Sequence, residues 1–114
     1  MALAAGRLDR RIRLERDTGA VDPASGERVA VWATLGPEKL WASRRRAGSS
    51  ETLAAAELSA AVSDVFEIRW DSTWADVNPK DRLVFEGRVY QIVSVDEIGR
   101  REGLRIGAVA RADQ

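Results

Sequence analysis

The sequence offers few side chains that could carry out catalysis, because its 114 residues include neither histidine nor cysteine. Without histidine, the hydroxyls of Ser43, Ser49 and Ser50 lack the base that most often activates a serine nucleophile. The glycine-containing segment 36–39 is too short for a phosphate-binding loop, and no Ser or Thr follows its lysine. The pattern therefore predicts neither nucleophilic catalysis nor phosphoryl transfer.

Carboxylates are the remaining candidates for acid-base chemistry or metal binding. Four acids in the central part of the sequence fall at predicted turns or on alternating faces of strands: Asp64, Glu67, Asp71 and Asp76. A paired-carboxylate hydrolase needs two acids that flank the reacting bond, and this spacing does not provide them. We interpret these residues as solvated surface acids beside arginines. We expect no enzyme activity, no tight metal binding and no cofactor.

Arg44, Arg45 and Arg46 form a run of three adjacent positive charges at the end of a predicted strand, just before a glycine-serine turn. In this position they could contact phosphates or an acidic partner ring. Alternatively, they form a solvated strand end that blunts edge-to-edge pairing of sheets. Because strand-end arginines contribute little to a core, we expect reversal of the three charges to leave the fold intact.

Tryptophan is abundant for a chain of this length, with four residues: Trp32, Trp41, Trp70 and Trp74. Interleaved with arginines, such rings could stack on the bases of a single-stranded nucleic acid. More often they are the large core residues that allow a small barrel to bury enough area. Trp32 and Trp41 could also anchor a subunit interface, where aromatic side chains are enriched. We expect most of the four to lie in the core.

Alternation of apolar and polar residues with a period of two predicts short β-strands along most of the chain. In the first, Leu8, Ile12 and Leu14 share one parity, with charged residues between them. Glu86-Gly87 predicts a tight hairpin turn, whereas 97–103 is a polar connection. The predicted strands cover 8–14, 28–35, 40–45, 65–70, 83–85, 89–95 and 104–109.

The segment Asp17–Glu27 separates the first two predicted strands and is rich in Gly, Pro, Asp and Ser. These residues favour turns over a regular element, so we interpret the segment as a long hairpin tip. Such a tip contributes little to a core, and shortening it should therefore cost little stability.

One helix is predicted midway along the chain. Gly48-Ser49-Ser50 supplies capping hydroxyls, Glu51 suits the positive end of the helix dipole, and Leu53–Ala61 is rich in helix formers. Together the elements predict a mainly β fold: a small antiparallel β-barrel or sandwich of six to seven strands with one inserted helix and a long hairpin loop. The sequence contains neither an internal repeat nor a low-complexity linker, so we expect one domain over residues 1–114.

The overall charge is balanced, with 18 basic and 18 acidic residues. A freestanding nucleic-acid-binding domain usually carries a clear basic excess, which this sequence lacks. The N-terminal apolar run is too short for a signal peptide, and no run approaches the roughly 20 apolar residues that cross a bilayer. We therefore expect a soluble protein that is made in the cytoplasm and has no membrane partner.

The order and spacing of several landmarks resemble a known family across nearly the whole chain. The landmarks are Gly6, Leu8, Arg11-Ile12-Arg13-Leu14, Asp22, Gly26, Trp32, Trp41-Ala42, a helix near Glu51, Phe66-Glu67-Ile68-Arg69-Trp70, Asp81-Arg82-Leu83, Gly87-Arg88-Val89-Tyr90-Gln91-Ile92, Arg101 and Leu104-Arg105-Ile106. In this order they resemble the phage head-tail joining proteins, also called head-closure or stopper proteins.

The resemblance implies a structural virion protein with a small β-barrel, located in the neck of a phage or of a phage-like gene transfer agent and assembled in the host cytoplasm. Copies would form a homo-oligomeric ring below the portal and adaptor proteins, close the DNA-filled head and provide the attachment site for tail-terminator or tail proteins. Double-stranded DNA would pass through the channel without sequence-specific binding. The near-zero net charge suits this role, because a channel through which DNA slides should not hold phosphates tightly.

In this role the hairpin tip would reach a neighbouring subunit, the adaptor or the channel. The candidate interface residues are Asp17, Asp22, Ser25, Glu27, Arg44, Arg45 and Arg46. Two other functions remain open on the sequence alone. One is a small β-barrel that binds single-stranded nucleic acid, which a salt-sensitive affinity for oligonucleotides would reveal. The other is a neighbouring neck or tail-completion protein of similar size.

Overall fold

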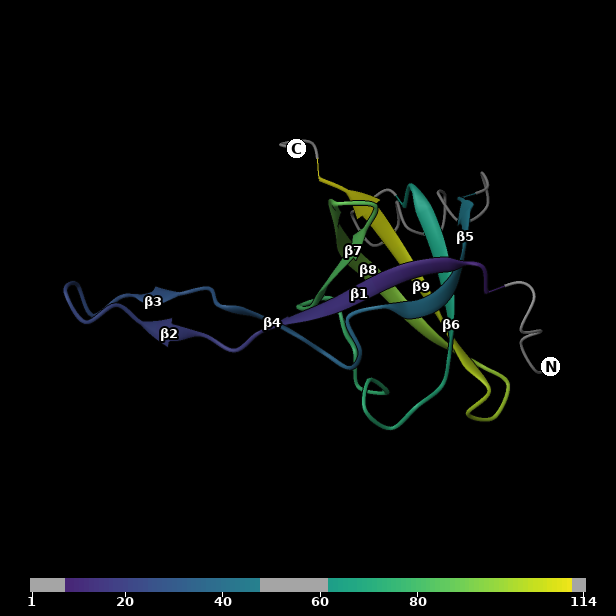
Figure 1. Ribbon diagram of the computed structural model, residues 1–114, viewed down its shortest axis with the longest axis horizontal. Helices are drawn as coiled ribbons and strands as arrows, with labels where there is room; N and C mark the ends of the chain where they lie inside the picture. The colour runs from purple at the N-terminus through teal and green to yellow at the C-terminus, as the bar shows by residue number, and fades with distance from the viewer. Residues whose placement is uncertain (1–7, 48–61, 112–114) are drawn as a thin grey trace.

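The computed structural model describes residues 8–47 and 62–111. Within these ranges the regular secondary structure consists of β-strands alone (Figure 1). The strands are β1 (Arg10–Asp17), β2 (Ala20–Val21), β3 (Arg28–Val29), β4 (Trp32–Thr34), β5 (Leu40–Arg46), β6 (Asp64–Arg69), β7 (Arg82–Phe85), β8 (Arg88–Ile98) and β9 (Gly103–Ala110). The predicted helix at 53–61 lies outside the described residues.

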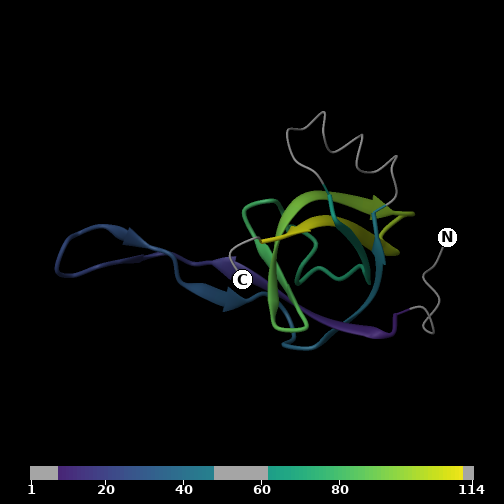
Figure 2. The same cartoon turned by 90° about the horizontal axis from the view of Figure 1, so that it is seen from above.

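Six strands close into an antiparallel barrel in the order β1-β5-β6-β9-β8-β7, and β7 pairs back with β1. Figure 2 shows this closure from above. Strand β1 pairs with β7 through Ile12–Glu15 on one edge, and with β5 through Arg10–Ile12. A seventh strand, β4, pairs with the end of β1 that lies beyond β5. The predicted antiparallel β-barrel with a long hairpin is confirmed.

The barrel encloses a core that follows the predicted alternation. Ile12 and Leu14 of β1 are buried, as are Phe66 and Ile68 of β6. The ring of Phe66 meets the rings of its neighbours edge-on, at 5.4 Å from Phe85 and 5.5 Å from Tyr90. Because every second residue points inward, the charged residues between these positions fall on the outer surface.

Four predicted element boundaries differ from the structure. Strand β1 covers Arg10–Asp17 in place of the predicted 8–14, because its last residues pair with β7 and β4. The strand predicted at 28–35 is divided into β3 and β4, which are separated by two residues outside regular pairing. The segment predicted as a tip contains β2, because Ala20 and Val21 pair with Val29 and Arg28 although turn-forming residues lie on both sides of them. Strand β8 continues to Ile98, beyond the predicted end at residue 95, because the outer face of the sheet accepts the polar residues of this segment. The predicted hairpin turn is confirmed, with φ of 52° at Glu86 and 76° at Gly87.

A hairpin arm, which we define as residues 18–31, extends from the end of β1 away from the barrel (Figures 1 and 2). Its strands pair through Ala20 with Val29 and through Val21 with Arg28. The molecule measures 50 × 29 × 25 Å, an elongated shape for a small barrel. The arm is a two-stranded ribbon, and such a ribbon is marginally stable when it packs against nothing else.

Candidate functional site

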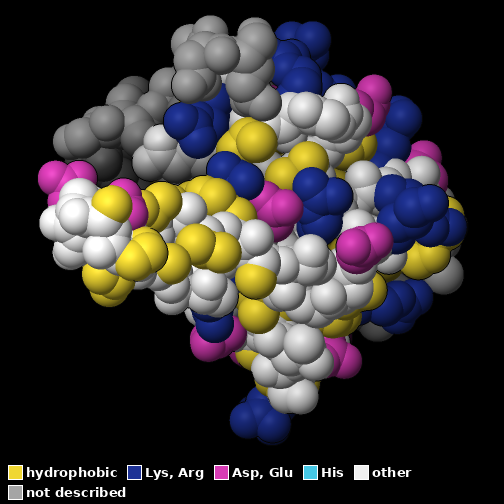
Figure 3. Space-filling view, turned by 60° about the vertical axis from the view of Figure 1, so that its left-hand side comes forward, with side chains coloured by type: hydrophobic (Ala, Val, Ile, Leu, Met, Phe, Trp, Pro, Cys, Tyr) yellow, Lys and Arg dark blue, Asp and Glu magenta, His cyan; other side chains and the backbone are white. Residues whose placement is uncertain are grey.

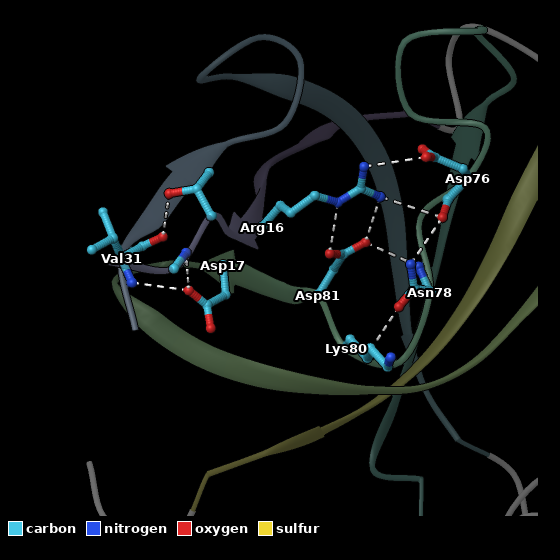
Figure 4. A network of polar contacts seen from close by, with 9 residues as sticks. Arg16, Asp17, Val31, Asp76, Asn78, Lys80 and Asp81 are labelled. Atoms are coloured by element: carbon cyan, nitrogen blue, oxygen red, sulfur yellow. Dashed lines mark hydrogen bonds and ion pairs between the residues drawn. The ribbon is translucent and has the colours of Figure 1, made fainter. Parts of the chain in front are cut away.

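Asp17 holds the two strands of the arm together where they leave the barrel. Its Oδ1 accepts hydrogen bonds from the backbone N–H groups of Val31 at 2.9 Å and Gly19 at 2.8 Å (Figure 4). The guanidinium of Arg28 pairs with the other carboxylate oxygen at 3.0 Å. These contacts, led by the hydrogen bond from Val31, lower the pKa of Asp17 below its usual value of 3.8. The predicted contact residue Asp17 is therefore an anchor of the arm.

Arg16 fastens the same end of β1 to the turn that precedes β7 (Figure 4). Its Nε and Nη2 each donate to a different oxygen of the Asp81 carboxylate at 3.0 Å, and Nη1 lies 3.2 Å from the carboxylate of Asp76. Asp81 is buried and also accepts a hydrogen bond from the backbone N–H of Asn78. The bonds to Asp81 and Asp76 raise the pKa of Arg16, and those from Arg16 lower the pKa of Asp76. The arm therefore starts from a fixed position.

The tip of the arm is closed by its own polar side chains. The carboxylate of Asp22 accepts hydrogen bonds from the backbone N–H of Ala24 at 2.9 Å and from the hydroxyl of Ser25 at 3.2 Å. The Ser25 hydroxyl in turn accepts from the backbone N–H of Glu27 at 3.3 Å. The predicted contact residues Asp22, Ser25 and Glu27 thus lie together at the tip. There, Asp22 and Ser25 also stabilise the turn, and the two acids make the tip negatively charged.

Exposed apolar side chains gather on the arm. Among the described residues, the large hydrophobic side chains that are exposed are Val21 (69%), Val29 (47%), Val31 (42%) and Trp41 (47%). Three of these belong to the arm. In Figure 3 the molecule is turned so that the arm points toward the viewer, and hydrophobic side chains are visible along it. Val29 shares one face of the ribbon with Ala20, and Val21 shares the other face with Arg28, so exposed apolar side chains lie on both faces of the arm.

The three adjacent arginines do not act as one cluster. Arg44 lies on the inward-facing parity of β5, and its Nη2 and Nε contact Oδ1 of buried Asp64 at 2.7 and 2.8 Å. Its guanidinium also lies 5.9 Å from the centre of the Phe85 ring. The expectation that all three strand-end arginines contribute little to the fold is therefore wrong for Arg44. Arg45 and Arg46 are exposed, and their role in an interface stays a prediction.

The expectation that most tryptophans lie in the core is also wrong. Of the four, only Trp74 is buried, whereas Trp41 is exposed and the other two are half-buried. The remaining three each have an arginine over the ring, which stabilises an aromatic side chain at the surface. The pairs are Arg11 with Trp41 at 3.6 Å, Arg82 with Trp32 at 4.1 Å, and Arg101 with Trp70 at 5.2 Å.

Glu15 is a buried acid that the sequence analysis did not single out. Its carboxylate accepts hydrogen bonds from Nε of Arg82 at 2.7 Å and from Nε of Arg13 at 2.8 Å. Burial raises the pKa of Glu15, but the bonds from Arg82 and Arg13 outweigh burial and lower it below 4.5. The pairing could be found only from the register of β1 and β7, which places Glu15 opposite Arg82.

The described ranges, 8–47 and 62–111, contain no group of three acidic side chains close enough to hold a metal ion. The same residues contain no helix that is long and apolar enough to cross a membrane. A surface depression of about 460 Å³ lies beside the base of the arm, and its lining is wholly polar or charged: Arg16, Asp17, Arg28, Asn78, Lys80 and Asp81.

Two solved structures share this fold. Protein SF1141 from Shigella flexneri 2a superposes with a TM-score of 0.75 and 24% identity, over 98% of this chain and 100% of that one. A chain from the virion of a native gene transfer agent particle superposes with a TM-score of 0.60 and 23% identity, over 90% of this chain and 93% of that one. At these identities the likeness concerns the fold. Comparison with curated proteins gives no match.

Comparison with protein-family models identifies the family. The model described as phage head completion protein matches residues 3–111, which is nearly the whole sequence. The match confirms the resemblance that the sequence landmarks indicated, and it agrees with the barrel fold. This chain therefore belongs to the phage head completion protein family.

Proposed function

We propose that the protein is a non-enzymatic structural subunit of the neck of a phage or phage-like particle. Copies form a homo-oligomeric ring beneath the portal and adaptor, close the DNA-filled head and present the attachment site for tail-terminator or tail proteins. Assembly takes place in the host cytoplasm. The whole chain, residues 1–114, acts as one domain in this role.

The observation that carries this proposal is the family match over residues 3–111. The arm supports assembly with other subunits, because its exposed valines are available for contact and its anchored base lowers the entropy lost on binding. The structural neighbour from a gene transfer agent virion is compatible with either kind of particle. Double-stranded DNA would pass through the ring without sequence-specific contacts, as the balanced charge favours.

Binding of single-stranded nucleic acid is less well supported. A single-strand-binding protein needs a basic groove along the backbone of the nucleic acid, whereas this sequence balances 18 basic with 18 acidic residues. Fluorescence anisotropy with a labelled oligonucleotide at low and physiological salt tests this function. A salt-sensitive affinity in the micromolar range or tighter would favour the nucleic-acid function over the neck function.

Imaging of the portal vertex tests the neck function directly. Purified protein is incubated in excess with tailless, DNA-filled heads, and the vertex is reconstructed by electron cryomicroscopy. We expect added ring-shaped density below the portal and adaptor. Heads incubated with an unrelated barrel protein of similar size serve as the control. The absence of added density, with the protein folded by circular dichroism, would rule out the head-closure assignment.

Replacing arm residues 20–29 with a two-residue Asn-Gly turn separates folding from assembly. We expect the melting temperature to change little, because this segment packs against no part of the described barrel core. Particles assembled with the shortened protein should leak DNA or lack tails. Fully tailed and infectious particles, or particles competent for gene transfer, would show that the arm is only a surface hairpin.

A further inference from the structure

We propose that the arm of each copy docks onto the outer surface around Trp41 of the next copy. We define this Trp41 surface as Arg11, Trp41, Ser43 and Arg69. The inference rests on the proposed function, because it specifies which two surfaces meet when copies form a ring. It identifies the partner of the exposed valines as a second copy of this chain.

The two surfaces lie at opposite ends of β1. Arg11, near the start of the strand, pairs with Trp41, whereas the arm continues from Asp17 at its end. At about 3.3 Å per residue, these positions are roughly 20 Å apart. The arm also points away from the barrel (Figure 1), so it cannot reach the Trp41 surface of its own chain. Each copy therefore offers one arm and one Trp41 surface to different neighbours.

This arrangement is heterologous, since two different surfaces of the same protein meet. Heterologous contacts repeat in a head-to-tail manner, and they close into a ring when the rotation between copies permits it. An isologous contact between two arms would instead cover both arms in a dimer and end the assembly. The position of the two surfaces thus matches the symmetry that a neck ring requires.

The chemistry of the two surfaces is complementary. On the arm, Val21 is the most exposed large hydrophobic residue and shares its face with Arg28, whose guanidinium is paired with Asp17. Asp22 and Glu27 add negative charge at the tip. On the barrel, the ring of Trp41 is 47% exposed, with the guanidinium of Arg11 at 3.6 Å. An exposed aromatic ring beside arginine is typical of the centre of a protein interface.

A second arginine flanks Trp41 on the other side. Arg69 is exposed at the end of β6, one position beyond the pair formed by Ala42 and Ile68, and this register places it next to Trp41. The Trp41 surface therefore has an apolar centre with positive charge on both sides. The arm has apolar side chains with negative charge at one end. A nucleic acid would be repelled by this acidic tip, which favours a protein partner.

Disulfide trapping tests the contact, and the natural chain contains no cysteine that could interfere. The test protein carries Val21→Cys on the arm and Ser43→Cys, which lies on the same face of β5 as Trp41. The matched control carries Val21→Cys with Gln91→Cys, an exposed position on β8. Both proteins are bound to tailless, DNA-filled heads, oxidised mildly and separated on non-reducing gels, while parallel samples are imaged.

We expect the test protein to give a ladder of covalent oligomers beyond the dimer. Its yield should exceed that of the control by at least about tenfold, because docking raises the local concentration of the two thiols. Ring density without such a ladder, or a cross-link only to another head protein, would overturn the inference and leave the proposed function standing. Failure of the unmodified protein to add ring density would overturn both.

Discussion

Charge reversal at Arg44 should destabilise the protein more than the same change at Arg46. In the folded protein Arg44 makes two short contacts with one oxygen of Asp64, whose side chain is only 6% exposed. Replacing Arg44 with Glu leaves this carboxylate buried and opposite a like charge. Arg46, at the end of the same strand, is exposed. Because the two variants make the same change in net charge, their difference isolates the contribution of the ion pair.

The magnitude follows from the burial of the pair. Breaking a fully buried ion pair by removing one partner costs about 3–5 kcal/mol. Water reaches this pair in part, since the Arg44 side chain is 28% exposed. In addition, the Ser63 hydroxyl still donates to the second oxygen of Asp64 at 2.8 Å. We therefore expect Arg44→Glu to lower the free energy of unfolding by about 2–3 kcal/mol. Arg46 lies opposite Asp64 in the pairing of β5 with β6 but is exposed, so Arg46→Glu should lower it by no more than about 1 kcal/mol.

Thermal unfolding followed by far-ultraviolet circular dichroism measures the difference. At about 4 °C per kcal/mol for a domain of this size, Arg44→Glu should lower the melting temperature by about 10 °C. Equal melting temperatures for the two variants would refute the structural role of Arg44. The result also determines the design of binding experiments. A loss of head binding by the triple reversal would report partly on folding, whereas Arg46→Glu disturbs the fold less and reports mainly on the interface.

Three further outcomes are expected. Gly36→Ala should lower the free energy of unfolding by about 2–3 kcal/mol in urea titrations, because the φ of Gly36 is +88° and the added Cβ would lie 2.8 Å from the Trp74 ring. Gly26 has a φ of +75° but open space around it, so Gly26→Ala should lower the free energy of unfolding by only about 1 kcal/mol. Equal losses for the two variants would contradict the packing argument. Because folding lowers the pKa values of Glu15 and Asp17, their ionised side chains stabilise the folded state fully at pH values above the unfolded pKa values of 4.5 and 3.8. This stability is lost as the pH falls through the folded pKa values. A melting temperature that stays constant from pH 5 to pH 3 would argue against these bonds. Sedimentation velocity should show mostly monomer in the absence of heads, and stable rings at micromolar concentration would be inconsistent with assembly on the portal.

The barrel could be predicted from the sequence because its signal is repeated along the chain. Ile12 and Leu14 in one strand, and Phe66 and Ile68 in another, alternate with polar residues, and the connections are short enough for antiparallel neighbours. The same period of two also contained information that the prediction did not use. Leu40, Ala42 and Arg44 share one parity, so the inward-facing, half-buried position of Arg44 follows from the pattern once the three arginines are considered separately.

The ion pairs that Arg16 and Glu15 make near the end of β1 could not be predicted, because each joins residues far apart in the sequence. The pairing of Arg16 with Asp81 spans 65 residues, and that of Glu15 with Arg82 spans 67. Local composition shows only that each residue is charged. Its partner depends on which strands become neighbours and in what register. The strand β2 was missed for a similar reason, since a two-residue strand has no period and is defined only by its pairing with β3.

The distribution of polar and apolar contacts along the arm suits assembly on a template. The strongest polar interactions, around Asp17 and between Arg16 and Asp81, lie within one chain and hold the base of the arm in place. The arm offers three exposed valines divided between its two faces, which is little apolar surface compared with a stable interface of about 1,200–2,000 Å². A single docking event is therefore weak, although a fixed arm loses little entropy when it binds. Many such contacts at the high local concentration of a portal vertex would be cooperative, and ring formation would then follow the completion of the head.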